Sequence, residues 1–303
     1  MGSGSFSFTS FSDYSISKRK IVDNSTGRVS AQKFETKRLD ESLDPNKFNI
    51  RECRNTEEHP NTIPVILALD VTGSMSEACD EVASILGILM TKLYEKYKDI
   101  EFCIMGIGDI AYDNSPIQMS QFESDVRIAE SLDKVYMEHG GGGNDYESYT
   151  AAWYMGLKHT QLDCYDKQGR KGIIITMGDE ALNPYLSKRY LQENAKEVNE
   201  EVDIETKPLY EAAKEKFDIY HIAVDSPHNS YCYYKDKARK TFGEILGSNF
   251  KEANIDNLAS VIEECIDASV QASSLGQNGY VTESIETKTN AEQNGSINGG
   301  ISW

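Results

Sequence analysis

The sequence lacks any apolar run near the roughly 20 residues that a helix needs to cross a bilayer. Its apolar stretches, such as residues 63–69, are much shorter. The first fifteen residues, MGSGSFSFTSFSDYS, also lack the basic segment and the following apolar segment of a secretory signal. We therefore expect no membrane contact and a cytoplasmic location.

Positive charge is scarce, with 31 Lys and Arg against 49 Asp and Glu and a net charge of −18. Residues 1–62 carry ten basic and nine acidic residues, and residues 271–303 carry one and three, so residues 63–270 hold a net charge of −17. Such a domain repels phosphate backbones, and we expect no nucleic-acid partner. Metal ions and basic protein surfaces suit it better, although an acidic surface that only aids solubility gives the same composition.

Several signatures of metal and catalytic chemistry are also missing. None of the six cysteines forms a C-x-x-C pair, and no two of the five histidines stand four residues apart. The sequence contains neither a G-x-x-x-x-G-K-S/T loop nor a G-x-S-x-G elbow. We expect buried, reduced thiols in a reducing compartment, and we do not expect an enzyme.

What the sequence does contain is an alternation of strand and helix patterns. Continuous apolar strands are expected at 65–69, 101–107, 172–177 and 218–224, with helices at 77–97, 124–136, 147–158, 234–246 and 258–272. Strands that are apolar on both faces belong to a sheet covered on both sides. The pattern predicts a three-layer, doubly wound α/β domain with a mostly parallel sheet over 63–272. Residues 1–62 are predicted to be an extended, partly disordered arm, and residues 273–303 a disordered polar tail.

The first of these strands ends in a carboxylate that is followed by two regularly spaced hydroxyls. Asp70, Thr72 and Ser74 stand in the stretch IPVILALDVTGSMS, where Gly73 turns the chain into a helix. Ligands bind beyond the carboxyl ends of parallel strands, and such oxygens suit Mg²⁺, with Mn²⁺ or Ca²⁺ as alternatives. A simpler interpretation is that Thr72 or Ser76 caps the helix, but capping explains only one hydroxyl.

Two further loops bring acids to comparable places. GGGGNDYES, residues 140–148, contains Asp145 and Glu147, and GIIITMGDE, residues 172–180, runs from an apolar strand into Asp179. A glycine run also forms flexible turns, and acids also favour a helix start. Both interpretations are compatible with ligation, so the three loops together predict one metal site.

DVTGSM after an apolar strand resembles the first motif, D-x-S/T-x-S, of von Willebrand factor A-type domains, which builds their metal-ion-dependent adhesion site. The order of motifs and elements is similar over about residues 63–270. Further stretches resemble a microbial and phage subgroup whose members are mostly of unknown role: LDP (43–45), MGIGD (105–109), QFESDVRIAESL (121–132), GGGGNDYESY (140–149) and GDE (178–180).

The resemblance implies roles for single residues. Asp70, Thr72 and Ser74 match the first motif. The second loop usually supplies a Thr, but here it is similar to the loop of integrin β subunits, in which a Glu binds the metal. Glu147 matches that Glu best, and Asp145 is the alternative candidate for this ligand.

The third motif departs from the family's pattern. It is usually T-D-G, whereas this chain has Thr176-Met177-Gly178-Asp179, with Met177 at the usual Asp position. Asp179 comes two residues later. The resemblance therefore implies either that Asp179 reaches the metal through water or that the metal binds more weakly.

In the family the metal keeps one open coordination position, and an Asp or Glu of a partner protein completes it. Binding there can couple to a shift of the last helix, here roughly 255–272. The resemblance thus implies a metal-dependent protein-interaction module, with a MoxR-type AAA ATPase as one expected partner. The alternatives are a structural or assembly protein, including a phage-encoded one, with optional metal, and a Mg²⁺-dependent hydrolase. For the hydrolase, the aspartyl-phosphate signature D-x-D fails because Thr72 replaces the second Asp.

Overall fold

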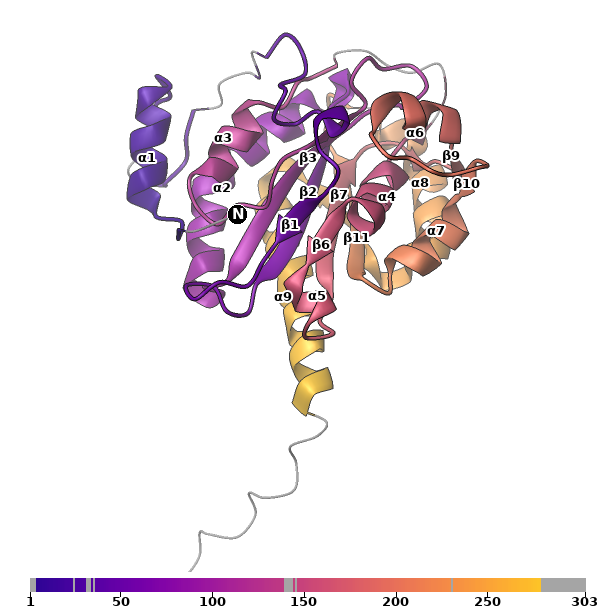
Figure 1. Cartoon of the computed structure of the whole chain (residues 1–303). Helices are drawn as coiled ribbons and strands as arrows, with labels where there is room; N and C mark the ends of the chain where they lie inside the picture. The colour runs from indigo at the N-terminus through magenta and orange to yellow at the C-terminus, as the bar shows by residue number, and fades with distance from the viewer. Residues whose placement is uncertain are drawn as a thin grey trace, which may run out of the picture.

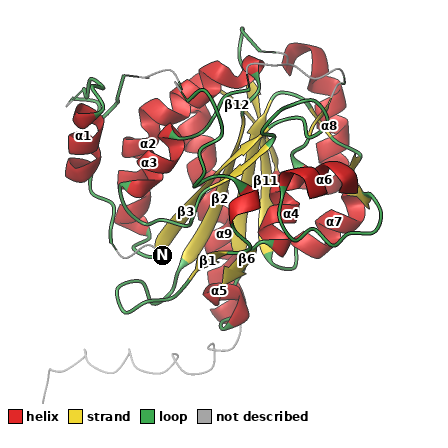
Figure 2. Ribbon diagram, turned by 45° about the horizontal axis from the view of Figure 1, so that its top comes forward, coloured by secondary structure: helices red, strands yellow, loops and turns green. Residues whose placement is uncertain are grey.

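The chain forms a twisted central sheet with helices on both of its faces (Figure 1). In this computed structural model the described residues are 4–23, 25–30, 34, 36–138, 144, 146–229 and 231–278. Figure 2 shows helices on each side of the sheet, and those on one side are α2 (Ser76–Lys96) and α3 (Arg127–Asp133). Those on the other side are α4 (Thr150–Lys158), α6 (Lys188–Asn194), α7 (Thr206–Ala213) and α8 (Tyr231–Leu246). The predicted three-layer α/β class is confirmed.

Within the described residues, the main sheet has six strands in the order β12-β11-β7-β2-β3-β4. All neighbours pair in parallel except β4, which pairs antiparallel with β3. The central strands are buried along nearly their whole length, as their continuous apolar sequences predict. The strands are β2 (Ile63–Asp70), β3 (Ile100–Ile107), β4 (Ile117–Met119), β7 (Gly172–Gly178), β11 (Phe217–Asp225) and β12 (Phe250–Asn254).

Helices divide between two hydrophobic cores, one on each face of the sheet. One core is built with α1 (Phe8–Ser17), α2 (Ser76–Lys96), α3 (Arg127–Asp133) and α9 (Leu258–Asn278). The other is built with α4 (Thr150–Lys158), α5 (Asp163–Asp166), α6 (Lys188–Asn194), α7 (Thr206–Ala213) and α8 (Tyr231–Leu246). No helix in the described part of the chain combines the length and the apolar character that a bilayer span requires.

The described residues also form three two-stranded sheets outside the main sheet. The pairs β1–β6 and β5–β8 are parallel, and β9–β10 is antiparallel. The strands are β1 (Arg51–Cys53), β5 (Tyr146–Glu147), β6 (Thr160–Leu162), β8 (Ala181–Leu182), β9 (Tyr185–Leu186) and β10 (Ile204–Glu205). Because Tyr146 and Glu147 form β5, the helix predicted from residue 147 begins only at Thr150.

Strand order reverses direction between β2 and β7, and this reversal places the candidate site. From β2 the chain moves outward to β3 and β4, and it then returns to build β7, β11 and β12 on the other side. The carboxyl ends of β2 and β7 therefore flank the switch point, where ligands bind in doubly wound sheets. Asp70 is the last residue of β2.

The N-terminal segment differs from the extended arm that the sequence predicts, because residues 8–17 form α1 and pack against α2. Phe8 and Phe11 are three residues apart and share one helix face, and the Ser7 hydroxyl accepts a hydrogen bond from Ser10 N. The Phe11 ring is 3% exposed and lies where a side chain on Gly87 of α2 would stand. Part of the predicted arm thus belongs to the core.

The predicted C-terminal boundary also differs. Helix α9 continues to Asn278, so the first six residues of the predicted tail are helical. Residues 279–303, the remainder of that prediction, lie outside the described residues. The predicted helix 124–136 is shorter in the structure, where α3 covers Arg127–Asp133.

Candidate metal centre

Asp70 is fully buried at the end of β2, and its carboxylate organises the loop that follows. Its Oδ1 accepts hydrogen bonds from Thr72 N at 2.9 Å and from Thr72 Oγ1 at 2.5 Å. Thr72 precedes a short 3-10 turn, Gly73–Met75, and makes no side-chain cap. Ser76 Oγ donates to Gly73 O instead of accepting from the helix. Helix capping therefore does not account for these hydroxyls.

The first and third loops meet through Ser74 and Asp179. Ser74 Oγ lies 3.4 Å from Thr72 Oγ1 and donates to Asp179 Oδ1 at 3.2 Å. Asp179 follows directly after β7 and is fully buried. Met177, at the usual position of the family's Asp, packs into the hydrophobic core next to Leu69. Asp179 stands two residues after Met177 and therefore lies beyond the end of β7, where its carboxylate faces Ser74.

Glu147 comes from β5, which pairs with β8 just beyond Asp179. Its side chain is 2% exposed, and its Oε2 has no hydrogen-bond partner within the described residues. Burial raises the pKa of Glu147, and the charges of Asp70 and Glu180 raise it further. Glu147 therefore joins the same group of acids, whereas Asp145 lies outside the described residues.

Tyr149 is a member of the site that sequence reasoning missed. Its hydroxyl donates to Asp70 Oδ2 at 2.8 Å and accepts from Glu180 N at 3.3 Å. A Cβ on Gly178 would stand 1.9 Å from that hydroxyl, so only glycine leaves room for it. No pattern around residue 149 predicts that this tyrosine reaches Asp70, because the space for its ring is left by Gly178 at the end of β7.

Two acids after β3 form an outer part of the site. Asp109 Oδ2 accepts from Asn144 Nδ2 at 2.7 Å, and Asp113 Oδ2 accepts from Asp109 N at 2.7 Å. Burial raises the pKa of Asp113 to about 6, and both charges contribute to the raised pKa of Glu147. Position after the carboxyl end of a parallel strand is the signal that could have identified Asp109.

The electrostatics of the site suit a cation. Burial raises the pKa of Asp70, the charge of Asp179 raises it further, and hydrogen bonds from Thr72 oppose the shift. The largest charge effects on both Asp70 and Glu147 thus come from other carboxylates. A buried group of acids is stabilised by a positive charge among them.

The donor set narrows which cation fits. Within the described residues, no three His, Cys, Asp or Glu side chains are grouped so as to hold a metal by themselves. An ion at Asp70 would therefore depend on the hydroxyls of Thr72 and Ser74 as well as on carboxylates. All of these are hard oxygen donors, which fit Mg²⁺, Mn²⁺ or Ca²⁺.

No family model and no curated protein matches this sequence. Among solved structures, the pilus adhesin SpaC from Lactobacillus rhamnosus GG in its open conformation aligns over 72% of this chain and 31% of SpaC, with 12% identity and a TM-score of 0.48. The vWF domain of the type V pili tip protein Mfa5 from Porphyromonas gingivalis aligns over 71% of this chain and 96% of the domain's own chain, with 12% identity and a TM-score of 0.38. This chain spans about a third of the SpaC chain. The fold assignment accordingly rests on the strand order of the chain itself.

Proposed function

We propose that this chain is a metal-dependent protein-interaction module and not an enzyme. The observation that carries the proposal is the convergence of Asp70, Thr72, Ser74 and Asp179 at the switch point of the sheet. Their oxygens come from two separate loops and lie next to further buried carboxylates. Fold likeness alone supports no function, so the proposal rests on this local chemistry and on the motif resemblance.

In the proposed site, Asp70, Thr72 and Ser74 hold Mg²⁺ first, with Mn²⁺ or Ca²⁺ as substitutes. Asp179 and Glu147 contribute directly or through water, and Asp145 remains a candidate. The cation supplies a Lewis-acidic position that an Asp or Glu of a partner protein completes. Tyr149 keeps Asp70 oriented through its hydrogen bond to Oδ2, and the surrounding core keeps solvent away from that carboxylate.

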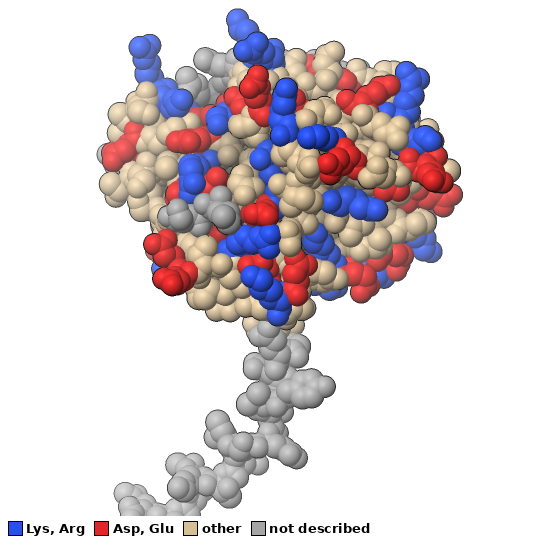
Figure 3. Space-filling view, in the orientation of Figure 1, with Lys and Arg blue, Asp and Glu red and all other residues tan. Residues whose placement is uncertain are grey.

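Surface charge supports a local site over general attraction. On the face shown in Figure 3, acidic and basic side chains are interspersed, so the net negative charge forms no continuous field there. Selective binding of an acidic partner residue would thus depend on the cation. The resemblance suggests a MoxR-type AAA ATPase as the partner class, and six unpaired cysteines support a reducing, cytoplasmic setting.

The first test is calorimetric titration of Mg²⁺ into the wild type, Asp70→Ala and Asp13→Ala. Asp13 is an exposed residue of α1 and serves as the matched control. We expect Asp70→Ala to abolish measurable binding, because the carboxylate that organises the loop is lost, and Asp13→Ala to bind as the wild type does. Equal binding by Asp70→Ala would remove this site from consideration.

Partner binding is tested separately by affinity purification in Mg²⁺ and in EDTA. A protein retained in Mg²⁺ but lost both in EDTA and with Asp70→Ala supports the interaction module. If Mg²⁺ binds but no protein is retained, assembly into larger particles is the remaining alternative. Phosphate release from a generic ester that disappears with Asp70→Ala would instead favour the hydrolase.

A further inference from the structure

A second candidate site lies at the opposite edge of the sheet from Asp70. A cavity of about 440 Å³ is bounded by the starts of β2 and β7 and by the last turns of α9. A neighbouring cavity of about 400 Å³ shares with it the residues Gln168, Arg170, Lys171 and Ser273. Volumes of this size are typical of small-molecule sites.

The walls of the larger cavity differ in chemistry. Ile63, Ile173 and Val270 provide an apolar floor from the two strands and the helix. Arg170 and Lys171 provide positive charge, and the Ser273 hydroxyl adds a polar group. The cavity thus combines an apolar surface with two cations.

The local fold explains why the cations stand there. Gly169 adopts a left-handed conformation, with φ of 65°, after the short helix α5. Its N–H donates to Tyr165 O, and Arg170 N donates to Cys164 O. This turn fixes Arg170 and Lys171 immediately before β7 begins at Gly172.

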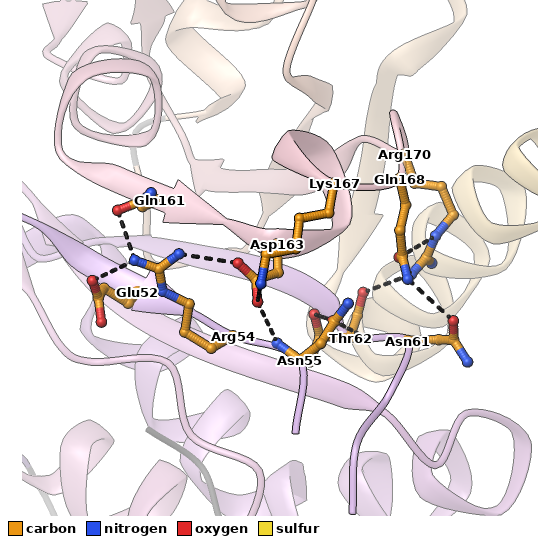
Figure 4. A network of polar contacts seen from close by, with 10 residues as sticks. All are labelled: Glu52, Arg54, Asn55, Asn61, Thr62, Gln161, Asp163, Lys167, Gln168 and Arg170. Atoms are coloured by element: carbon orange, nitrogen blue, oxygen red, sulfur yellow. Dashed lines mark hydrogen bonds and ion pairs between the residues drawn. The ribbon is translucent and has the colours of Figure 1, made fainter. Parts of the chain in front are cut away.

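Arg170 differs from the other cations of the same polar network, which Figure 4 shows. There Arg54 pairs with Glu52 at 2.7 Å and with Asp163 at 3.0 Å, and Lys167 also pairs with Asp163. The Arg170 guanidinium instead donates to the Gln168 amide oxygen at 2.5 Å and to Thr62 O at 3.4 Å. Within the described residues it forms no ion pair.

Lys171 also lacks a close ion pair within the described residues. Its Nζ lies 4.0 Å from Asp218 Oδ1, at the outer limit of an ion pair. Asp218 lines the neighbouring cavity and not the larger one. Among its described lining residues, the larger cavity therefore presents two positive groups and no carboxylate, in a chain whose net charge is −18.

We propose that this cavity binds a small organic anion, with its carboxylate or phosphate on Arg170 and Lys171 and its apolar body on Ile63, Ile173 and Val270. A planar guanidinium matches the oxygens of either anion and can donate two parallel hydrogen bonds to them. The net charge of the protein repels anions, so affinity depends on this local pair of cations. The site is independent of the proposed metal centre.

The test is calorimetry of the full chain with hexanoate, hexyl phosphate, inorganic phosphate and hexylammonium. We expect hexanoate or hexyl phosphate to bind more tightly than inorganic phosphate, because only they contact the apolar floor. Comparing these two anions distinguishes a carboxylate from a phosphate ligand. Arg170→Gln should weaken binding at least about tenfold. Arg189→Gln, which alters an exposed arginine of α6, should leave binding unchanged.

Three results would overturn the proposal: no binding of either hexyl anion at about 10 mM, equal binding by Arg170→Gln, or equal binding of hexylammonium. Amide chemical-shift mapping of the wild type keeps the test valid if Arg170→Gln folds poorly. Shifts should concentrate at residues 168–173 and 269–274. Shifts elsewhere would place the ligand outside this cavity.

Discussion

Glu147 holds a carboxylate oxygen that is buried and accepts no hydrogen bond within the described chain. Burying an ionised carboxylate without an opposite charge costs several kcal/mol. Burial raises the pKa of Glu147, and the surrounding acids raise it further, so the folded chain favours either a proton or a nearby cation. Removing this charge should therefore stabilise the metal-free protein and weaken its binding of a metal ion.

Glu147→Gln should raise the free energy of unfolding in EDTA by about 1–2 kcal/mol, because the neutral amide needs neither a buried charge nor the uptake of a proton on folding. The same variant should lose most of the rise in melting temperature that Mg²⁺ gives the wild type. Thermal unfolding in EDTA and in Mg²⁺ measures both effects. Glu244→Gln, on the exposed side of α8, is the control. An undiminished Mg²⁺ effect in Glu147→Gln would show that Glu147 does not contribute to the metal site.

At this scale, sequence spacing predicts some members of the site but not others. Asp70, Thr72 and Ser74 come together because one turning loop carries all three, and such spacing is visible in a single stretch. Tyr149 reaches Asp70 only because Gly178 leaves space for it. That dependence joins two loops more than 25 residues apart, so no local pattern contains it.

Among the elements, the buried strands are the most predictable, and α1 is the least. A strand covered on both faces reads as a continuous apolar run, which β2, β3 and β7 each show. In the N-terminal segment, Phe6 and Phe8 fit the period of a strand, whereas Phe8 and Phe11 fit a helix. The space at Gly87 favours the helix, and that space belongs to α2, far away in the sequence.

Two helical glycines give a matched test of this packing. A Cβ on Gly87 would stand 2.2 Å from the Phe11 ring, whereas a Cβ on Gly243 of α8 would meet no described atom within 4 Å beyond the nearby backbone of its own helix. Gly243→Ala should stabilise the protein by up to about 1 kcal/mol. Gly87→Ala should lose that gain and loosen α1, which is measured as faster hydrogen exchange at residues 8–17. Equal stabilisation by both substitutions would show that α1 does not depend on the Phe11 contact.

For the whole molecule, Glu101 links folding to pH. It lies in β3 with 1% of its surface exposed and accepts a hydrogen bond from the Cys53 thiol at 3.1 Å. Burial raises its pKa from 4.5 to about 7. Between these two values the folded chain binds more protons at this residue than the unfolded chain does. Stability from Glu101 therefore falls as the pH rises through this range.

Glu101→Gln removes this pH dependence, because the neutral amide does not ionise. Relative to the wild type, the variant should gain stability progressively from pH 4.5 to pH 7, reaching at most about 3 kcal/mol. Denaturant unfolding in EDTA across this range measures the difference and keeps metal binding out of it. A stability difference that stays constant with pH would contradict the raised pKa of Glu101.

The contact between Gly178 and Tyr149 has a consequence for homologous sequences. Any side chain at position 178 would displace the Tyr149 ring. A smaller residue at position 149 would remove the hydroxyl that donates to Asp70 Oδ2. A substitution at position 149 or 178 therefore disturbs the site unless the other position changes as well. In homologues the two should co-vary, so that a residue larger than glycine at 178 is accompanied by a side chain smaller than tyrosine at 149.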